Sequence, residues 1–218
     1  MPSKSLLDFE YNLMFDVTRL IETHSRLNHE GGGRRGLGHL TRSGVFMLCA
    51  AWELYLEEVA IESAKFLCNK NNSPKDLPKQ VQKEISNSVK TSKHELKPLE
   101  LSGDGWKEIY ISHVDVLTKK LNTPKSPVVD ELFKITVGIK NISDQWTLGK
   151  KKIDDFVTAR GDIAHRGRAA KYIKIWILNE YKKNVIYTIQ ETDNILADYL
   201  KNFSPDGKSP WRRRHITP

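Results

Sequence analysis

Hydrophobic positions recur at helical spacing along much of the chain. From Ser5 to Leu27, apolar residues return every three or four positions, and a longer stripe of the same period runs from about Thr41 to Cys68. The longer stripe consists of Val45, Leu48, Cys49, Trp52, Leu56, Val59, Ala60, Ser63, Phe66 and Leu67. Two such helices pack side by side and bury their stripes against each other, and the glycine-rich stretch 31–38 between them predicts a loop.

The chain changes character after the second helix. Residues 69–78 are rich in Asn, Pro and Lys, and Ser102-Gly-Asp-Gly105 predicts a turn, so we expect an insertion, about 69–125, with one or two short amphipathic helices. Ser126-Pro127 then suits an N-cap and a first helical position. Further on, the pattern predicts a helix over 153–166 and a closing helix over 172–200, where a strand at 173–178 is the alternative.

These elements predict an all-α helical bundle with an inserted segment between the second long helix and the helix at 153–166. We expect one domain over residues 1–203. The segment 204–218 carries Trp211 followed by three arginines and lacks a core pattern, so it is expected to be a basic, flexible tail. An aromatic residue beside arginines can also stack on single-stranded RNA, but a solubilising tail is favoured.

Composition adds charge and compartment to this picture. The 218 residues carry a net charge of +8, which makes an anionic partner such as nucleic acid plausible without establishing one. Cys49 and Cys68 fall in the apolar helical pattern and have no metal-ligand spacing, which indicates buried thiols in a reducing compartment. With no long apolar run and acidic residues near the start, we expect a cytoplasmic protein that does not span a membrane.

One charged residue interrupts the apolar face of the helix at 153–166. Ile153, Phe156, Val157, Ile163 and Ala164 share that face, and Arg160 falls near its middle, where a leucine would be expected. Burying a guanidinium without a partner is costly, so the chain must offer a carboxylate, an opening to water or an anionic ligand. Glu53, beside the stripe of the second helix, is the candidate carboxylate.

His165 follows Arg160 by five residues, about 7.5 Å along the helix axis and well round its circumference. One helix cannot easily bring the two side chains together, whereas a cleft shared with a second copy could. A histidine near neutral pH can move the proton of a ribose 2′-hydroxyl that attacks the adjacent phosphate. An arginine can bind the phosphate oxygens and stabilise the charge that develops on them.

Three segments, in order, resemble a known family. Arg160-Gly-Asp-Ile-Ala-His165 resembles the arginine–histidine motif of the HEPN superfamily, and the run 48–57, LCAAWELYLE, is similar to the second-helix signature of its RiboL-PSP-HEPN branch. Between them, Asn122-Thr-Pro-Lys125 with Leu132-Phe133 and Gly138-Ile139 also resembles that branch. The resemblance covers about residues 40–200.

The resemblance implies an all-α HEPN fold, a homodimer with both motifs at its interface, and metal-independent RNA cleavage in a toxin or anti-phage defence role. It assigns Arg160 and His165 as catalytic, with Glu53 and Asp162 as supporting residues. The position after the arginine is usually polar, commonly Asn, and here it is Gly161. The tyrosine of HEPN toxins that are neutralised by nucleotidyltransferase antitoxins is replaced by Gly167, which argues against regulation of that type. The resemblance leaves an antitoxin or a defence-system protein as a candidate partner.

Alternatives remain open at each position. Arg160 and His165 can be a structural ion-pair member and an interfacial histidine, and Arg166 and Arg168 can be RNA-binding residues or a solvated helix end. The other histidines lack metal-ligand spacing, so neither a metal nor a cofactor is expected. The main alternative function is a non-catalytic HEPN module that binds RNA or a partner protein. A DNA-binding regulator is weaker, because no helix-turn-helix spacing is evident.

Overall fold

A computed structural model describes residues 1–28 and 36–216 of the chain. Within these residues every regular element is helical, which confirms the predicted all-α class. The longer helices are α2 (Met14–Asn28), α3 (Gly38–Lys70), α4 (Lys79–Lys90), α5 (Gly105–Thr118), α6 (Ser126–Thr136), α7 (Lys150–Arg166) and α8 (Ile175–Lys201). Shorter ones are α1 (Lys4–Asp8), η1 (Phe9–Leu13), η2 (Pro74–Asp76), η3 (Lys97–Leu101), η4 (Ile142–Gln145) and η5 (Gly167–Ala169).

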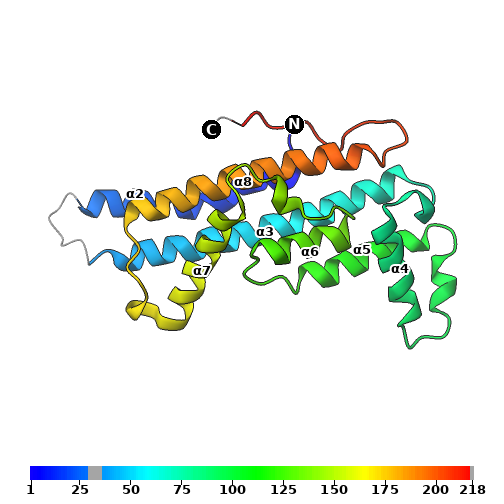
Figure 1. Ribbon diagram of the computed structural model, residues 1–218, viewed down its shortest axis with the longest axis horizontal. Coiled ribbons are helices and arrows are strands. Elements are labelled where there is room, and N and C mark those ends of the chain that lie inside the picture. The colour runs from blue at the N-terminus through cyan, green and yellow to red at the C-terminus, as the bar shows by residue number, and fades with distance from the viewer. Residues whose placement is uncertain (29–35, 217–218) are drawn as a thin grey trace.

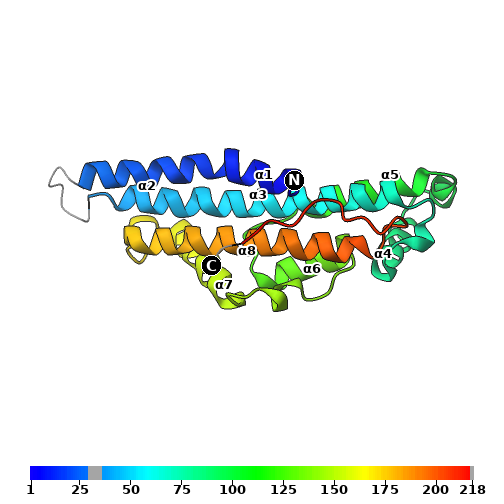
Figure 2. The same ribbon diagram turned by 90° about the horizontal axis from the view of Figure 1, so that it is seen from above.

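The long helix α3 is the spine of an elongated bundle. Figure 2 shows α1 and α2 along one side of α3 and α8 along the other, and Figure 1 shows α7 and α6 beneath it, with α4 and α5 at its C-terminal end. The apolar stripe predicted for this helix is buried except for Phe66, which is partly exposed, and Trp52 and Tyr55 in the middle of α3 are fully inaccessible to solvent. A helix that is covered on several sides has to be apolar around most of its circumference, which explains the stripe's breadth.

Polar anchors tie the other elements to this spine. The indole Nε1 of Trp52 donates to the carbonyl of Pro124 at 3.0 Å, and the hydroxyl of Tyr55 donates to the carbonyl of Ile189 in α8 at 3.2 Å. The start of α6 is tied to α7, because the backbone N–H and the hydroxyl of Ser126 donate to Asp154 at 2.7 and 2.8 Å. Ser126 therefore begins the helix itself, one residue beyond the N-cap position predicted for it.

The segment after α8 corrects the expectation of a tail without core contacts. Trp211 is only 7% exposed, and its indole Nε1 donates to the carbonyl of Asp193 in α8 at 3.0 Å. The backbone of Arg214 exchanges two hydrogen bonds with the Asn194 side chain, and the N–H of Arg212 donates to the carbonyl of Met1 at 2.9 Å. The single buried indole of Trp211 anchors the segment to α8, and the spacing of apolar residues does not predict such an isolated contact.

Candidate functional site

Helix α7 positions the arginine–histidine motif. Its apolar side is buried at Ile153, Phe156, Val157 and Ile163, whereas Ala164, which was expected on the same face, is exposed. Gly149 precedes the helix at φ 76°, and Gly167 ends it at φ 53°, where its N–H donates to the carbonyl of Ile163. Both glycines adopt the left-handed region that other residues rarely enter, so they fix where α7 begins and ends.

Arg160 lies between α7 and α3 and packs on an aromatic ring. Its Cζ is 5.2 Å from the centroid of the Phe46 ring, within the range of a cation–π interaction. The side chain is half-buried, and its Nε is buried without a hydrogen-bond partner. Among the described residues no carboxylate forms an ion pair with this guanidinium. Arg160 therefore keeps its positive charge unneutralised at the junction of the two helices.

The expected pairing of Arg160 with Glu53 is wrong. Glu53 Oε1 instead accepts the backbone N–H of Thr123 at 2.5 Å and lies 3.8 Å from the Sγ of Cys49. Thr123 has φ 45°, an uncommon conformation for a threonine, and the Glu53 carboxylate satisfies its N–H. Sequence spacing placed Glu53 on the correct side of α3, but it could not reveal this competing backbone donor.

Cys49 lies beside both charged groups. Burial, and then the nearby Glu53 carboxylate, raise the pKa of its thiol to about 12, although the positive charge of Arg160 acts in the opposite direction. At neutral pH the thiol is therefore protonated and donates weakly to Glu53. Cys49 is a packed, unreactive neighbour of Arg160.

His165 is exposed near the end of α7. Five residues of helix rotate it by about 140° from Arg160 and move it about 7.5 Å along the axis, so the two side chains point in different directions. No hydrogen bond or ion pair joins His165 to another residue in the described ranges. A single chain therefore presents the two motif residues without bringing them together.

Asp162 and Arg166 stabilise the end of the motif helix. Asp162 Oδ1 forms an ion pair with Arg166 Nε at 3.0 Å, and Asp162 Oδ2 accepts the backbone N–H of Lys171 at 3.2 Å. The ion pair links two residues that lie one turn apart in α7, and the hydrogen bond from Lys171 ties α7 to the segment that leads into α8. Asp162 thus orders the chain around His165, and Arg166 is partly neutralised.

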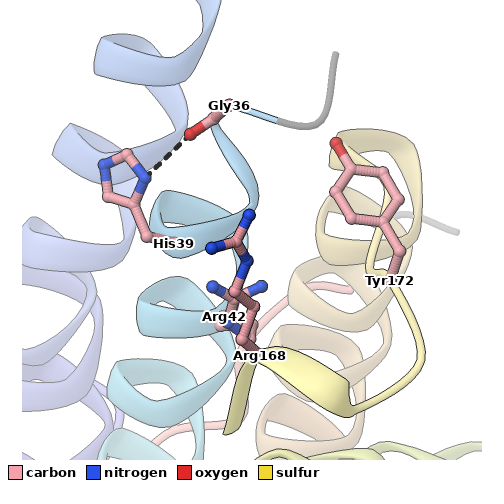
Figure 3. A pocket seen from close by; sticks show the side chains of 5 residues that line it. All are labelled: Gly36, His39, Arg42, Arg168 and Tyr172. Carbon is pink, nitrogen blue, oxygen red and sulfur yellow. Dashed lines mark hydrogen bonds between the residues drawn. The ribbon is translucent and has the colours of Figure 1, made fainter.

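Arg168 opens onto a pocket that the sequence pattern did not indicate. The pocket has a volume of about 620 Å³, and residues from the start of α3 and the α7–α8 connection line it (Figure 3). These residues are Gly36, His39, Arg42, Arg168 and Tyr172. Helical spacing alone could have suggested Arg42, because it lies one turn before Phe46 on the same side of α3.

The described residues contain neither a metal cluster nor a membrane-spanning helix. Across residues 1–28 and 36–216, no three His, Cys, Asp or Glu side chains lie together in a way that could hold a metal ion. In the same residues no helix is both long and apolar enough to cross a bilayer.

Comparison with known proteins agrees with the order of the motif segments. The family model described as RiboL-PSP-HEPN matches residues 13–198, which includes α3, α6, α7 and most of α8. No curated protein and no solved structure matched the chain. The match spans well over half of the sequence, and the structure is all-α as that family requires. The chain therefore belongs to the RiboL-PSP-HEPN family, a branch of the HEPN superfamily.

Proposed function

We propose that this protein is a metal-independent endoribonuclease in which Arg160 and His165 are the catalytic residues. The observation that carries the proposal is the state of Arg160: its guanidinium lies over Phe46, its Nε is buried without a partner, and no carboxylate of the described residues forms an ion pair with it. Because burying such a charge is costly, its retention on the same helix as an exposed histidine favours an anionic ligand. The family supplies the second support, since an arginine–histidine motif is the feature of HEPN ribonucleases.

Each residue has a defined part in the proposed reaction. His165 takes the proton of a ribose 2′-hydroxyl as its oxygen attacks the adjacent phosphorus, or returns a proton to the departing 5′-oxygen. Arg160 binds the non-bridging phosphate oxygens and stabilises the negative charge of the transition state. The P–O5′ bond breaks, leaving a 2′,3′-cyclic phosphate and a 5′-hydroxyl. Glu53 and Asp162 act as supporting residues, since Glu53 accepts the N–H of Thr123 beside α3 and Asp162 ties α7 to Lys171.

We further propose a homodimer, because one chain turns the two catalytic side chains apart. The open side of α3 next to Phe46 carries Met47, Ala50 and Leu54 on successive turns, and Met47 is 40% exposed and Leu54 37% exposed. Apolar residues in such a stripe suit a second copy of the same surface. A dimer formed there would bring His165 of one copy towards Arg160 of the other.

Subunit mixing tests this arrangement. Arg160→Gln and His165→Ala proteins are inactive alone if both residues are needed. When the two are co-expressed, a heterodimer contains one site with both residues intact, so part of the activity returns. If the purified heterodimer were inactive while the wild-type dimer cleaves, a site shared between copies would be excluded.

The biological role that this activity fits is a toxin or anti-phage defence nuclease acting on cytoplasmic RNA, held in check by an antitoxin or another defence-system partner. The alternative is a non-catalytic HEPN module that binds RNA or a partner protein, and Gly161 in place of the usual polar residue favours it.

Purified wild-type, Arg160→Gln and His165→Ala proteins, incubated with mixed single-stranded and transfer RNA in EDTA, separate the two functions. If the protein is the nuclease, the wild type should cleave RNA and the two motif variants should not. The control His94→Ala, which removes an exposed histidine outside the motif, should cleave as the wild type does. RNA binding without cleavage in all four proteins would establish the non-catalytic module.

A further inference from the structure

The pocket beside the motif is built for an anion. Among the residues that the structure describes, its lining includes two arginines and a histidine, Arg42, Arg168 and His39, and no acidic residue (Figure 3). Within the described part of the chain neither arginine is paired with a carboxylate, whereas Arg166 next to them is paired with Asp162. Arg42 and Arg168 thus bring two positive charges to one opening, and an anion bound there would be attracted to both guanidinium groups.

The walls of the pocket are held in place by close packing at Gly38. A Cβ atom at this position would lie 3.0 Å from Cε2 of Tyr172 and 3.1 Å from Nη1 of Arg42. A glycine therefore lets the tyrosine ring and the guanidinium lie close to α3, and a larger residue would push them outward by a few tenths of an ångström. The Nδ1 of His39 lies 3.1 Å from the carbonyl of Gly36. Arg42 and His39 thus have defined contacts in the wall of the pocket, while Arg168 is exposed at its edge.

The pocket lies next to the proposed cutting residues. Arg42 precedes Phe46 by four residues, about 6 Å along α3, and Arg160 packs on Phe46. Arg168 lies in η5, three residues after His165, which is near the end of α7. A chain of phosphates laid along the α3–α7 junction would thus meet Arg160 and then the pair Arg42 and Arg168.

We infer that this pocket is a phosphate-binding subsite for single-stranded RNA, in which Arg42 and Arg168 hold a phosphodiester next to the one that is cut. The inference rests on the proposed function, since it places the same strand across Arg160. The subsite sets the affinity and register of the strand, while Arg160 and His165 carry the chemistry. A free nucleotide presents the same phosphate chemistry, and the experiment below distinguishes it from a strand.

Binding of a fully 2′-O-methylated, fluorescent single-stranded RNA tests the subsite independently of cleavage, because this RNA has no 2′-hydroxyl to attack. Arg42→Gln and Arg168→Gln should each weaken binding about 5- to 10-fold, and each should lower the slope of log affinity against log salt by about 0.7. Arg168 is exposed, so its variant keeps the fold. Lys201→Gln, a charge loss at the exposed end of α8, should leave both quantities unchanged.

Equal affinity and equal salt dependence in wild type, Arg42→Gln and Arg168→Gln would overturn the inference. It would also fall if a ribonucleoside triphosphate bound wild type and lost affinity in Arg42→Gln while RNA binding stayed constant, since the pocket would then hold a free nucleotide. If Arg42→Gln weakened RNA binding in a protein that never cleaves RNA, the subsite would stand and the nuclease would not.

Discussion

The guanidinium of Arg160 rests on the ring of Phe46, with 5.2 Å between Cζ and the ring centroid. This contact joins the motif helix α7 to the spine α3 without cancelling the arginine's charge. A carboxylate partner would have compensated the burial better, but it would also have occupied the group that is proposed to bind phosphate. The structure thus retains a cation at the helix junction by aromatic packing.

Replacing the aromatic ring should loosen the catalytic arginine. Phe46→Leu keeps an apolar side chain but removes the cation–π interaction, so RNA cleavage should slow about 3- to 10-fold. Phe46→Tyr keeps a ring and should retain near wild-type cleavage. The rates of both variants, measured at saturating RNA, check this expectation, and equal rates in the two would argue that the ring has no such role.

Gly161 occupies open space in the middle of α7. No heavy atom lies within 4 Å of a Cβ built on it, so Gly161→Ala should stabilise the protein by about 1 kcal/mol through reduced backbone freedom in the unfolded chain. Gly44→Ala is the matched control, because a Cβ there would lie 2.5 Å from Cδ2 of the buried Leu178. That variant should lose about 1–3 kcal/mol. Urea denaturation of both measures the difference, and destabilisation by Gly161→Ala would contradict the packing described.

Asp193 should make stability depend on pH. Burial raises the pKa of its carboxyl from 3.8 to about 7, against hydrogen bonds from Ser3, and the nearby Glu62 and Glu10 raise it further. Between these two values the folded chain holds a proton that the unfolded chain releases. Its contribution is therefore complete below about pH 4 and is lost as pH rises to about 7.

The Asp193→Asn variant isolates that group. An amide can exchange hydrogen bonds with Ser3 and never ionises, so the variant should gain stability relative to wild type as pH rises from 4 to 7. Thermal denaturation of both proteins across this range provides the comparison. A constant difference between them would show that Asp193 does not titrate there.

Trp211 should be as important for stability as a core residue. Its indole is buried against α8, so Trp211→Ala should cost about 3 kcal/mol in the free energy of unfolding. Trp176, which is 58% exposed, is the matched control, and Trp176→Ala should change stability by less than about 0.5 kcal/mol. Equal denaturant midpoints for the two variants would restore the interpretation of a tail without core contacts.

The sequence predicted the helices well and the contacts between them poorly, for a physical reason. Periodicity reports which face of a helix is buried, so the stripe from Val45 to Leu67 and the apolar side of α7 could be recognised. The partner of a given side chain depends on how distant segments meet. Thr123 lies 70 residues from Glu53 in the sequence and yet donates its N–H to the Glu53 carboxylate, and Arg160 packs on Phe46.

The basic pocket escaped prediction for the same reason. His39 and Arg42 begin one helix and Arg168 follows another, so only the fold brings them together. The arginine–histidine motif could be found from the sequence, because Arg160 and His165 lie on one helix at a fixed spacing along the chain. Their proposed catalytic role remains a prediction.

The nature of the RNA ends tests the central claim most directly. A single-stranded RNA cleaved by the wild-type protein in EDTA should carry 2′,3′-cyclic phosphate and 5′-hydroxyl ends, and the same RNA with 2′-O-methyl groups should stay intact. Cleavage that requires a divalent metal, or that leaves 3′-hydroxyl and 5′-phosphate ends, would contradict a mechanism in which Arg160 and His165 drive attack by the 2′-hydroxyl.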